Sequence, residues 1–173
     1  VEPDIAKWLD DKEIILIRGP RQSGKTTLLE RIRETLLKRG VDEKDIVLVT
    51  FEDDLERMKF EKNPKEFIGF HQTKKTWFLF DETQYVKDVG KTLKLLYDTY
   101  PNAKFIATGS SSFDLTELGK YLVGRVVFVD VLPFSFSEFL RAKSPKHEKK
   151  LIELKAKTAS GKVVETTFLA EFN

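Results

Sequence analysis

Apolar residues in this chain gather in five short runs, and most of these runs are followed by a longer segment with helical spacing. The runs cover residues 14–17, 46–51, 77–80, 105–108 and 126–131. Continuously apolar strands are typical of parallel sheets that are buried on both faces. The pattern therefore predicts an α/β fold, an open five-stranded parallel sheet flanked by helices, with ligands at the carboxyl ends of the strands.

The segments between the runs predict helices of differing clarity. Leucine and isoleucine recur at helical spacing over 28–37, and Gly40 is placed to end that helix. A second helix is expected over 89–100, a short one over 117–123, and an amphipathic N-terminal one from Pro3 to Leu9. Residues 52–75 are charged and irregular, which indicates a short helix with a loop.

The end of the chain is the least patterned part. Phe134, Phe136, Phe139 and Leu140 predict a closing helical element, and we expect one domain over residues 1–141. The basic stretch 143–150 is typical of a linker or loop. The remainder fits either a hairpin turning at Ser160-Gly161 or the start of a C-terminal helical lid, so residues 142–173 are expected to be a linker and the start of a lid or further domain.

Composition narrows the class of protein. Apolar residues make up 40% of the 173 residues and charged residues 34%, which fits one water-soluble domain. Apolar runs are shorter than the ~18–20 residues of a membrane span, and the N-terminus lacks a signal-peptide pattern. The chain has no cysteine and a net charge of +2. We expect a cytoplasmic protein without a membrane partner, and the charge balance gives no support for DNA binding.

A glycine-rich motif lies between the first strand and the first long helix. The sequence from Gly19 to Thr26, GPRQSGKT, matches G-x-x-x-x-G-K-[ST] at each fixed position. Such a loop turns its backbone N–H groups toward phosphates, the lysine neutralises the β- and γ-phosphates, and the hydroxyl that follows binds Mg²⁺. We expect Lys25 to face the surface at the helix start. The predicted nucleotide-binding residues are Gly19, Arg21, Gln22, Ser23, Gly24, Lys25, Thr26 and Thr27.

Two acidic residues follow the third strand. Asp81 stands where P-loop enzymes place the carboxylate that organises Mg²⁺, so Thr26 and Asp81 are the predicted metal-binding residues. Glu82 is placed to accept a proton from an attacking water, which favours a hydrolase. The alternative is a solvated acidic turn.

Polar residues also follow the fourth strand and precede the fifth. Thr108 and Ser110, within the sequence TGSSS over 108–112, are placed to sense a γ-phosphate, or else form a helix-capping turn. Arg125 could reach a phosphate in a neighbouring subunit and stabilise transition-state charge, or else form a surface ion pair.

These motifs together resemble the ATPase domain of an AAA-type family of archaea and bacteria, often called the archaeal ATPase or AAA-14-like group. The resemblance is carried by GPRQSGKTTLL at 19–29, LFDETQ at 79–84, TGSSS at 108–112, LVGR at 122–125 and LPFSFSEFL at 132–140. It implies a P-loop core that binds ATP and Mg²⁺ and continues into a lid and a further domain. Thr83 stands where the family more often has an apolar residue, a difference we expect to be harmless.

The function expected from these residues is Mg²⁺-dependent ATP hydrolysis that drives a conformational change in an attached or partner domain, in a homo-oligomer with Arg125 acting in trans. Glu82, Lys25, Arg125 and Ser110 are the predicted catalytic residues. Three alternatives stay open. The chain could be a DNA-processing ATPase, a nucleotide-regulated scaffold with little turnover, or a nuclease using the E-x-K spacing of Glu153 and Lys155.

Overall fold

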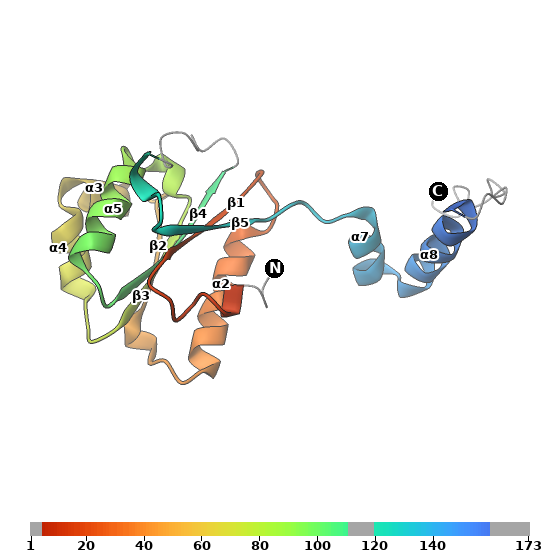
Figure 1. Cartoon of the computed structure of the whole chain (residues 1–173), viewed down its shortest axis with the longest axis horizontal. Helices are drawn as coiled ribbons and strands as arrows, with labels where there is room; N and C mark the ends of the chain where they lie inside the picture. Colours follow the sequence, from red (N-terminus) through yellow and green to blue (C-terminus); the bar gives the residue numbers. More distant parts are fainter. Residues whose placement is uncertain (1–4, 111–119, 160–173) are drawn as a thin grey trace. The chain divides into compact units, whose positions relative to one another are not determined.

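A five-stranded parallel sheet is the centre of the fold. The computed structural model describes residues 5–110 and 120–159, and it separates into two units, Val1–Pro133 and Phe134–Asn173. The sheet lies in the first unit, and its strand order is β2-β3-β4-β1-β5, with each neighbouring pair parallel (Figure 1). The predicted α/β class is confirmed. The strands are β1 (Ile14–Gly19), β2 (Ile46–Thr50), β3 (Thr76–Asp81), β4 (Ala103–Ser110) and β5 (Val126–Asp130).

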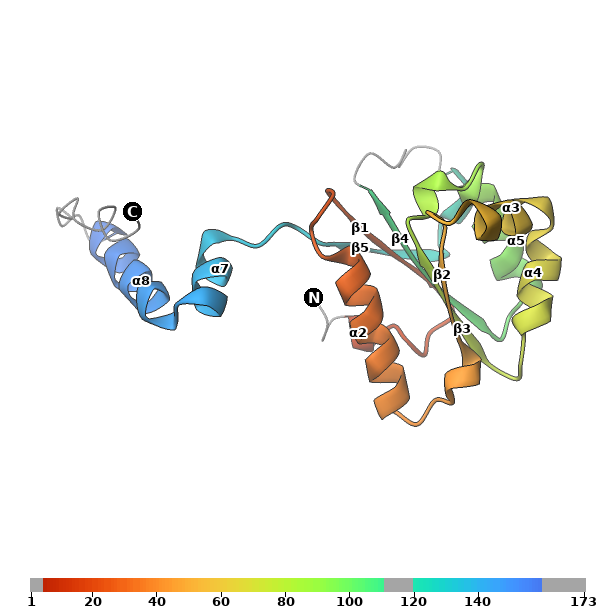
Figure 2. The same cartoon turned by 180° about the vertical axis from the view of Figure 1, so that it is seen from behind.

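Helices cover both faces of this sheet. Helix α2 (Lys25–Lys38) lies on one face, whereas α3 (Asp54–Lys62), α4 (Pro64–His71) and α5 (Val89–Thr99) lie on the other (Figures 1 and 2). Successive residues of a strand point to opposite faces. Accordingly, Ile17 belongs to the core cluster that contains Leu29 of α2, whereas Leu16 belongs to the cluster that contains Leu93 of α5. Burial on both faces explains why the three central strands, β1, β3 and β4, are almost continuously apolar. The edge strands β2 and β5 are apolar too, although they are only partly buried.

The segment 52–75 forms two helices instead of one short helix and a loop. Asp53 caps α3 by accepting hydrogen bonds from the backbone N–H groups of Leu55 and Glu56. Asn63 caps α4, which begins at Pro64. Each helix buries one large apolar side chain, Phe60 in α3 and Ile68 in α4. Because each helix buries only one large apolar side chain, the sequence shows little helical periodicity in this segment. The capping residues indicate the two helices more clearly.

The second unit is a helical pair. Helix α7 (Phe136–Lys143) begins at a capping box in which Ser135 and Glu138 exchange hydrogen bonds, and α8 spans Pro145–Ala159. The prediction of a loop over 143–150 is therefore wrong, because residues 145–150 belong to α8. Pro145 suits the first helical turn, and the lysine, glutamate and leucine residues after it are good helix formers. The proposed hairpin turn at 160–161 lies outside the described residues, and the boundary after 141 stays a prediction.

Other terminal and loop predictions have mixed outcomes. Residues 5 and 6 are helical, and residues 7 and 8 form a turn. The helix expected over 3–9 therefore does not continue to residue 9. Of the short helix expected over 117–123, residues 120–123 are described; residues 120–122 are helical and residue 123 is in a turn. Within the described ranges, no helix is long and apolar enough to cross a membrane.

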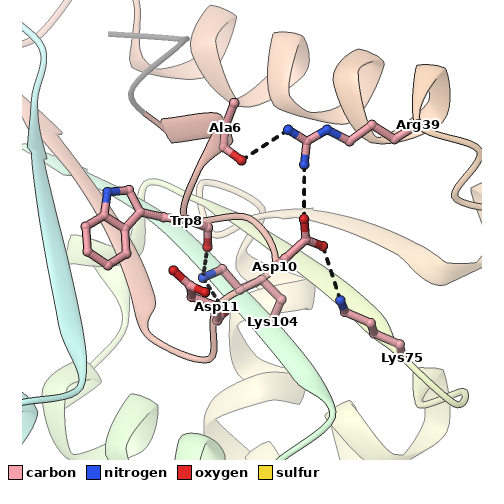
Figure 3. Close-up of polar contacts among 7 residues, drawn as sticks. All are labelled: Ala6, Trp8, Asp10, Asp11, Arg39, Lys75 and Lys104. Atoms are coloured by element: carbon pink, nitrogen blue, oxygen red, sulfur yellow. Dashed lines mark hydrogen bonds and ion pairs between the residues drawn. The ribbon is translucent and has the colours of Figure 1, made fainter.

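A buried lysine ties the N-terminal segment to the amino edge of the sheet. Lys104 is 2% exposed, and its ammonium group donates hydrogen bonds to the backbone oxygens of Trp8 and Asp11 (Figure 3). It also donates to the backbone oxygen of Glu13. The predicted strand begins at residue 105, whereas β4 begins two residues earlier and so includes Lys104.

Two further cations hold the same segment through one carboxylate. Asp10 lies 3.3 Å from Nη1 of Arg39, which follows α2, and 3.4 Å from Nζ of Lys75, which precedes β3 (Figure 3). Arg39 also donates to the backbone oxygen of Ala6 at 3.1 Å. Exposed ion pairs of this kind contribute little stability each. We therefore expect the buried Lys104 to be the energetically important contact of this segment.

The stability of the protein should depend on pH through Lys104. Burial lowers the pKa of Lys104 from its ordinary 10.5 to about 8. Between these two values the unfolded chain holds a proton that the native chain has lost, so stability rises with pH. Relative to Lys104→Met, we expect the wild type to gain roughly 2 kcal/mol of unfolding free energy between about pH 7.5 and pH 10.

Urea denaturation of both proteins at each pH measures this gain. Lys91→Met, which removes an exposed lysine, is the matched control and should show a difference from the wild type that does not change with pH. A difference between wild type and Lys104→Met that is equally constant would contradict the depressed pKa.

Candidate functional site

The loop from Gly19 to Thr26 joins β1 to α2 at the carboxyl edge of the sheet. A side chain at Gly19 would place its Cβ 2.1 Å from the backbone oxygen of Val131, so the segment after β5 leaves room only for glycine. Gly24, the N-cap residue of α2, and Gln22 adopt left-handed backbone conformations with φ of 92° and 62°. The loop is therefore tightly folded, as the glycine-rich motif predicts.

The start of α2 suits an anion. Gly24 provides no side chain to cap the helix, and its first turn contains no acidic residue. The first N–H groups of a helix lack partners within the helix and carry a partial positive charge. Of the predicted nucleotide-binding residues, those on the exposed side of the loop and first turn are Arg21, Gln22, Gly24, Thr26 and Thr27.

Lys25 and Ser23 are buried beneath this loop. Lys25 is 4% exposed, which corrects the expectation of a surface-facing side chain, and its Nζ donates to the backbone oxygen of Pro20 at 2.9 Å. Among the described residues, no carboxylate forms an ion pair with it. The Ser23 hydroxyl is also buried and has no hydrogen-bond partner there. A buried ammonium group without a counter-ion and an unpaired hydroxyl fit a phosphate ligand.

Asp81, at the end of β3, is shared between two hydroxyl groups. Thr26 of α2 donates to Asp81 Oδ2 at 2.9 Å, and Thr108 of β4 donates to Asp81 Oδ1. Asp81 is 7% exposed and Thr108 is fully buried. The structure therefore brings both predicted metal-binding residues together. Mg²⁺ prefers oxygen ligands and is usually bound by one or two carboxylates with phosphates and water, so this donor set fits it.

The turn after β3 is held against β4 by three further hydrogen bonds. Glu82 has a left-handed backbone with φ of 56°, and its N–H donates to Thr108 Oγ1 at 2.9 Å. Thr83 is fully buried and donates to the backbone oxygen of Thr108 at 2.6 Å. The backbone N–H of Ser110 donates to Gln84 Oε1 at 3.2 Å. Thr83 is thus a buried hydrogen-bonding residue, where the sequence indicated only a harmless departure from the family.

The side chain of Gln84 also contacts the predicted general base. Its amide Nε2 donates a hydrogen bond to Glu82 Oε2. From the sequence, Gln84 serves only as part of the family motif at 79–84, and no chemical role is expected for it. The signal that could have found it is its position two residues after Glu82 in a turn at the carboxyl edge.

Arg125 lies away from these residues. It immediately precedes β5, and its backbone oxygen accepts a hydrogen bond from the N–H of Ile14 at the start of β1. This is the amino edge of the sheet, opposite the loop. The side chain forms an ion pair with Asp98 at 3.2 Å and lies over the ring of Tyr97. Within one chain, the structure therefore does not bring Arg125 to the other predicted site residues.

The other candidates are residues 111 and 112 of the serine-rich motif and the pair Glu153 and Lys155. Of the motif at 108–112, residues 111 and 112 lie outside the described residues. Glu153 and Lys155 lie two positions apart on α8, and residues so spaced on a helix do not face each other. The described residues contain no group of three His, Cys, Asp or Glu side chains that could hold a metal. The described residues therefore give no support for the nuclease alternative, which stays a prediction.

Sequence comparison finds a match to a family model and relatives that are longer than this chain. A family model described as an AAA domain matches residues 11–140. An uncharacterized protein of Haemophilus influenzae is 31% identical over 156 residues, which are 86% of this chain and 38% of that protein. An uncharacterized protein of Methanocaldococcus jannaschii is 34% identical over 76% of this chain and 28% of its own length. The chain spans about a third of the length of these relatives.

Solved structures share the fold at low sequence identity. The structure of PCH-2 from C. elegans has a TM-score of 0.56 and 18% identity, covering 93% of this chain and 44% of that one. DnaA from Aquifex aeolicus, bound to AMPPCP, also has a TM-score of 0.56, with 14% identity over 84% of this chain and 49% of that one. At these identities the likeness establishes the architecture alone.

The close approach at Gly19 gives a test of the loop. We expect Gly19→Ala to lower the free energy of unfolding by about 1–3 kcal/mol, because the added Cβ overlaps the backbone oxygen of Val131. Gly69→Ala is the matched control. Its Cβ would lie 3.3 Å from the Tyr100 hydroxyl, inside a helix where alanine is favoured, and its effect should stay below about 1 kcal/mol. Equal stabilities of the two variants in urea denaturation would contradict the predicted packing.

Proposed function

The chain belongs to the AAA domain family, and from this premise we propose that it binds ATP with Mg²⁺ at the β1–α2 loop and hydrolyses it. The observation that carries the proposal is the shared carboxylate of Asp81, bonded to Thr26 of the loop helix and to Thr108 of β4, with Glu82 next in the chain. The residues that bind phosphate, the residues that bind the metal and the general base would then all lie at the carboxyl edge of the sheet.

Each of these residues would act at a definite point. The N–H groups at the start of α2 and the ammonium group of Lys25 would receive the phosphates, displacing the present contact of Lys25 with Pro20. Thr26 and Asp81 would hold Mg²⁺, which would supply positive charge to the phosphate oxygens. Glu82 would accept a proton from water as the water oxygen bonds to the γ-phosphorus. The bond from that phosphorus to the bridging oxygen breaks, and ADP leaves with the electron pair.

The end of β4 is the element that would transmit the state of the nucleotide. Thr108 already contacts Asp81 and the turn carrying Glu82, so a change at the phosphate would alter the position of β4 relative to β3. We propose that this movement drives an attached or partner domain. The hydrogen bonds of Thr108 and Thr83 support this role because they make the two strand ends one connected unit.

DNA-dependent hydrolysis is the second candidate function. Lys143, Lys146 and Lys149 are exposed around the turn between α7 and α8, and a cluster of exposed lysines can bind a phosphate backbone. Duplex DNA that raises the hydrolysis rate, less strongly as salt is added, would favour this function. A rate that does not respond to DNA would favour a protein partner.

Substitutions at Lys25 and Glu82 separate nucleotide binding from turnover. Lys25→Ala should weaken Mg²⁺-ATP binding by about 10-fold or more, because it removes a charged hydrogen-bond donor to phosphate.

Glu82→Gln should retain binding and lower turnover roughly 10²–10⁴-fold, because an amide cannot accept the proton. Calorimetry measures the first effect and steady-state phosphate release the second.

The outcomes of this pair of experiments are distinct. Unchanged affinity in Lys25→Ala would refute the phosphate site. Unchanged turnover in Glu82→Gln would refute the base. ATP binding with negligible wild-type turnover would instead support a nucleotide-regulated scaffold.

Arg125 is proposed to complete the site of a neighbouring copy in a homo-oligomer. Its position at the amino edge supports a role in trans, whereas its ion pair with Asp98 supports a role within its own chain. If it acts in trans, Arg125→Ala should lower turnover roughly 10³-fold with little effect on ATP affinity. Asp98→Ala, the matched control, breaks the same ion pair and should largely retain activity.

Mixing experiments complete this test. Specific activity of the wild type should rise with protein concentration, and mixtures of Arg125→Ala with Glu82→Gln should recover part of the activity. Equal losses in Arg125→Ala and Asp98→Ala, without recovery on mixing, would assign Arg125 to the ion pair alone.

A further inference from the structure

We propose that Gln84 is a positioning residue that orients the carboxylate of Glu82 relative to the end of β4. The inference rests on the proposed function, in which Glu82 is the general base. Gln84 belongs to the short 3₁₀ helix Thr83–Tyr85 directly after Glu82, and both Glu82 and Gln84 are half-buried. One side-chain amide there touches both the base and the neighbouring strand.

The two ends of the Gln84 amide have different and complementary partners. The Nε2 group donates to Glu82 Oε2, and Oε1 accepts from the backbone N–H of Ser110. An ionised carboxylate can only accept hydrogen bonds, and a backbone N–H can only donate one. Only this orientation of the amide satisfies both partners. Gln84 therefore links the Glu82 carboxylate to the main chain of β4 in a defined direction.

The contacts of Thr108 hold the backbone at Glu82 but do not restrain the Glu82 side chain. The Glu82 N–H is held by Thr108 Oγ1, and the next residue, Thr83, is held by the Thr108 backbone oxygen. The backbone N–H of Glu82 and the side chain of Thr83 are thus both bonded to β4. Rotation of the carboxylate itself is restricted by Gln84, the residue of the described structure that bonds to it.

The two carboxylate oxygens of Glu82 differ in their hydrogen bonding. Oε2 accepts the hydrogen bond from Gln84, whereas Oε1 accepts none from the described residues. Oε1 is therefore the oxygen assigned to receive the proton from water. Misplacement of a reacting group by about 1 Å can lower a rate roughly 10²-fold. Loss of the Gln84 contact should accordingly act on turnover and leave ATP affinity unchanged.

Two substitutions of Gln84 distinguish positioning of the base from bracing of β4. Gln84→Met preserves the length of the side chain and removes both hydrogen bonds. Gln84→Glu retains an acceptor for the Ser110 N–H but places a carboxylate against that of Glu82. We expect kcat for Mg²⁺-ATP to fall roughly 10- to 100-fold in Gln84→Met and at least as far in Gln84→Glu, with KM within about twofold of the wild type.

Matched variants make the result specific. Gln72→Met changes another half-buried glutamine, after α4 and away from this edge, and should leave kcat unchanged. In the Glu82→Gln background, Gln84→Met should cause no further loss, because the base it orients is already absent. Thermal unfolding of each variant confirms that the compared proteins are folded.

Each outcome bears on one of the two proposals. Wild-type kcat in Gln84→Glu with a loss in Gln84→Met would assign Gln84 to bracing β4 and overturn this inference. Full activity in both Gln84 variants, while Glu82→Gln is inactive, would overturn it and leave the proposed function intact. Unchanged turnover in Glu82→Gln would overturn the proposed base and this inference with it. Losses in kcat that multiply with that of Glu82→Gln would also overturn the positioning role.

Discussion

The carboxylate of Asp81 is bonded through both oxygens to hydroxyl groups from segments far apart in the sequence. Thr26 lies 55 residues before it and Thr108 lies 27 residues after it, yet the strand order places the ends of β3, β4 and β1 side by side. Parallel strands all end at one edge of a sheet, so residues at their carboxyl ends can meet without long loops. The glycine-rich loop, the two predicted metal-binding residues and the turn with Glu82 all depend on this convergence.

The opposite edge of the sheet has a structural role within the chain. Lys104 anchors the N-terminal segment through three backbone oxygens, and Arg125 pairs with Asp98 beside it in the same half of the fold. A buried ammonium group satisfied only by neutral carbonyls is costly to desolvate. This desolvation cost falls on Lys104, which fixes the segment that precedes β1. Chemistry and anchoring are therefore separated by the length of the strands.

The sequence was sufficient for the parts that depend on local pattern, and insufficient where a side chain acts across strands. The loop at 19–26 follows from the fixed spacing of its motif, and the acid at 81 follows from its place directly after an apolar run. The strands themselves are visible in the sequence as apolar runs. The contacts of Thr83 and Gln84 depend on which strand lies beside β3, and this is not encoded locally. The same holds for Lys104, whose charge argues against a buried strand position until its three acceptors are known. The first part of helix α8, residues 145–150, was missed because its lysines outweigh its few apolar positions.

Three described residues other than glycine have positive φ values, and two of them, Gln22 and Glu82, lie at the candidate site. Such conformations cost on the order of 1 kcal/mol and persist where surrounding contacts enforce them. Glycine or asparagine would relieve that cost at either position. Selection for heat resistance alone should therefore favour replacing two residues of the candidate site. If Glu82 is the base proposed above, its positive φ means that this protein gives up part of its stability for the position of one carboxylate, a balance that directed evolution for robustness would readily upset.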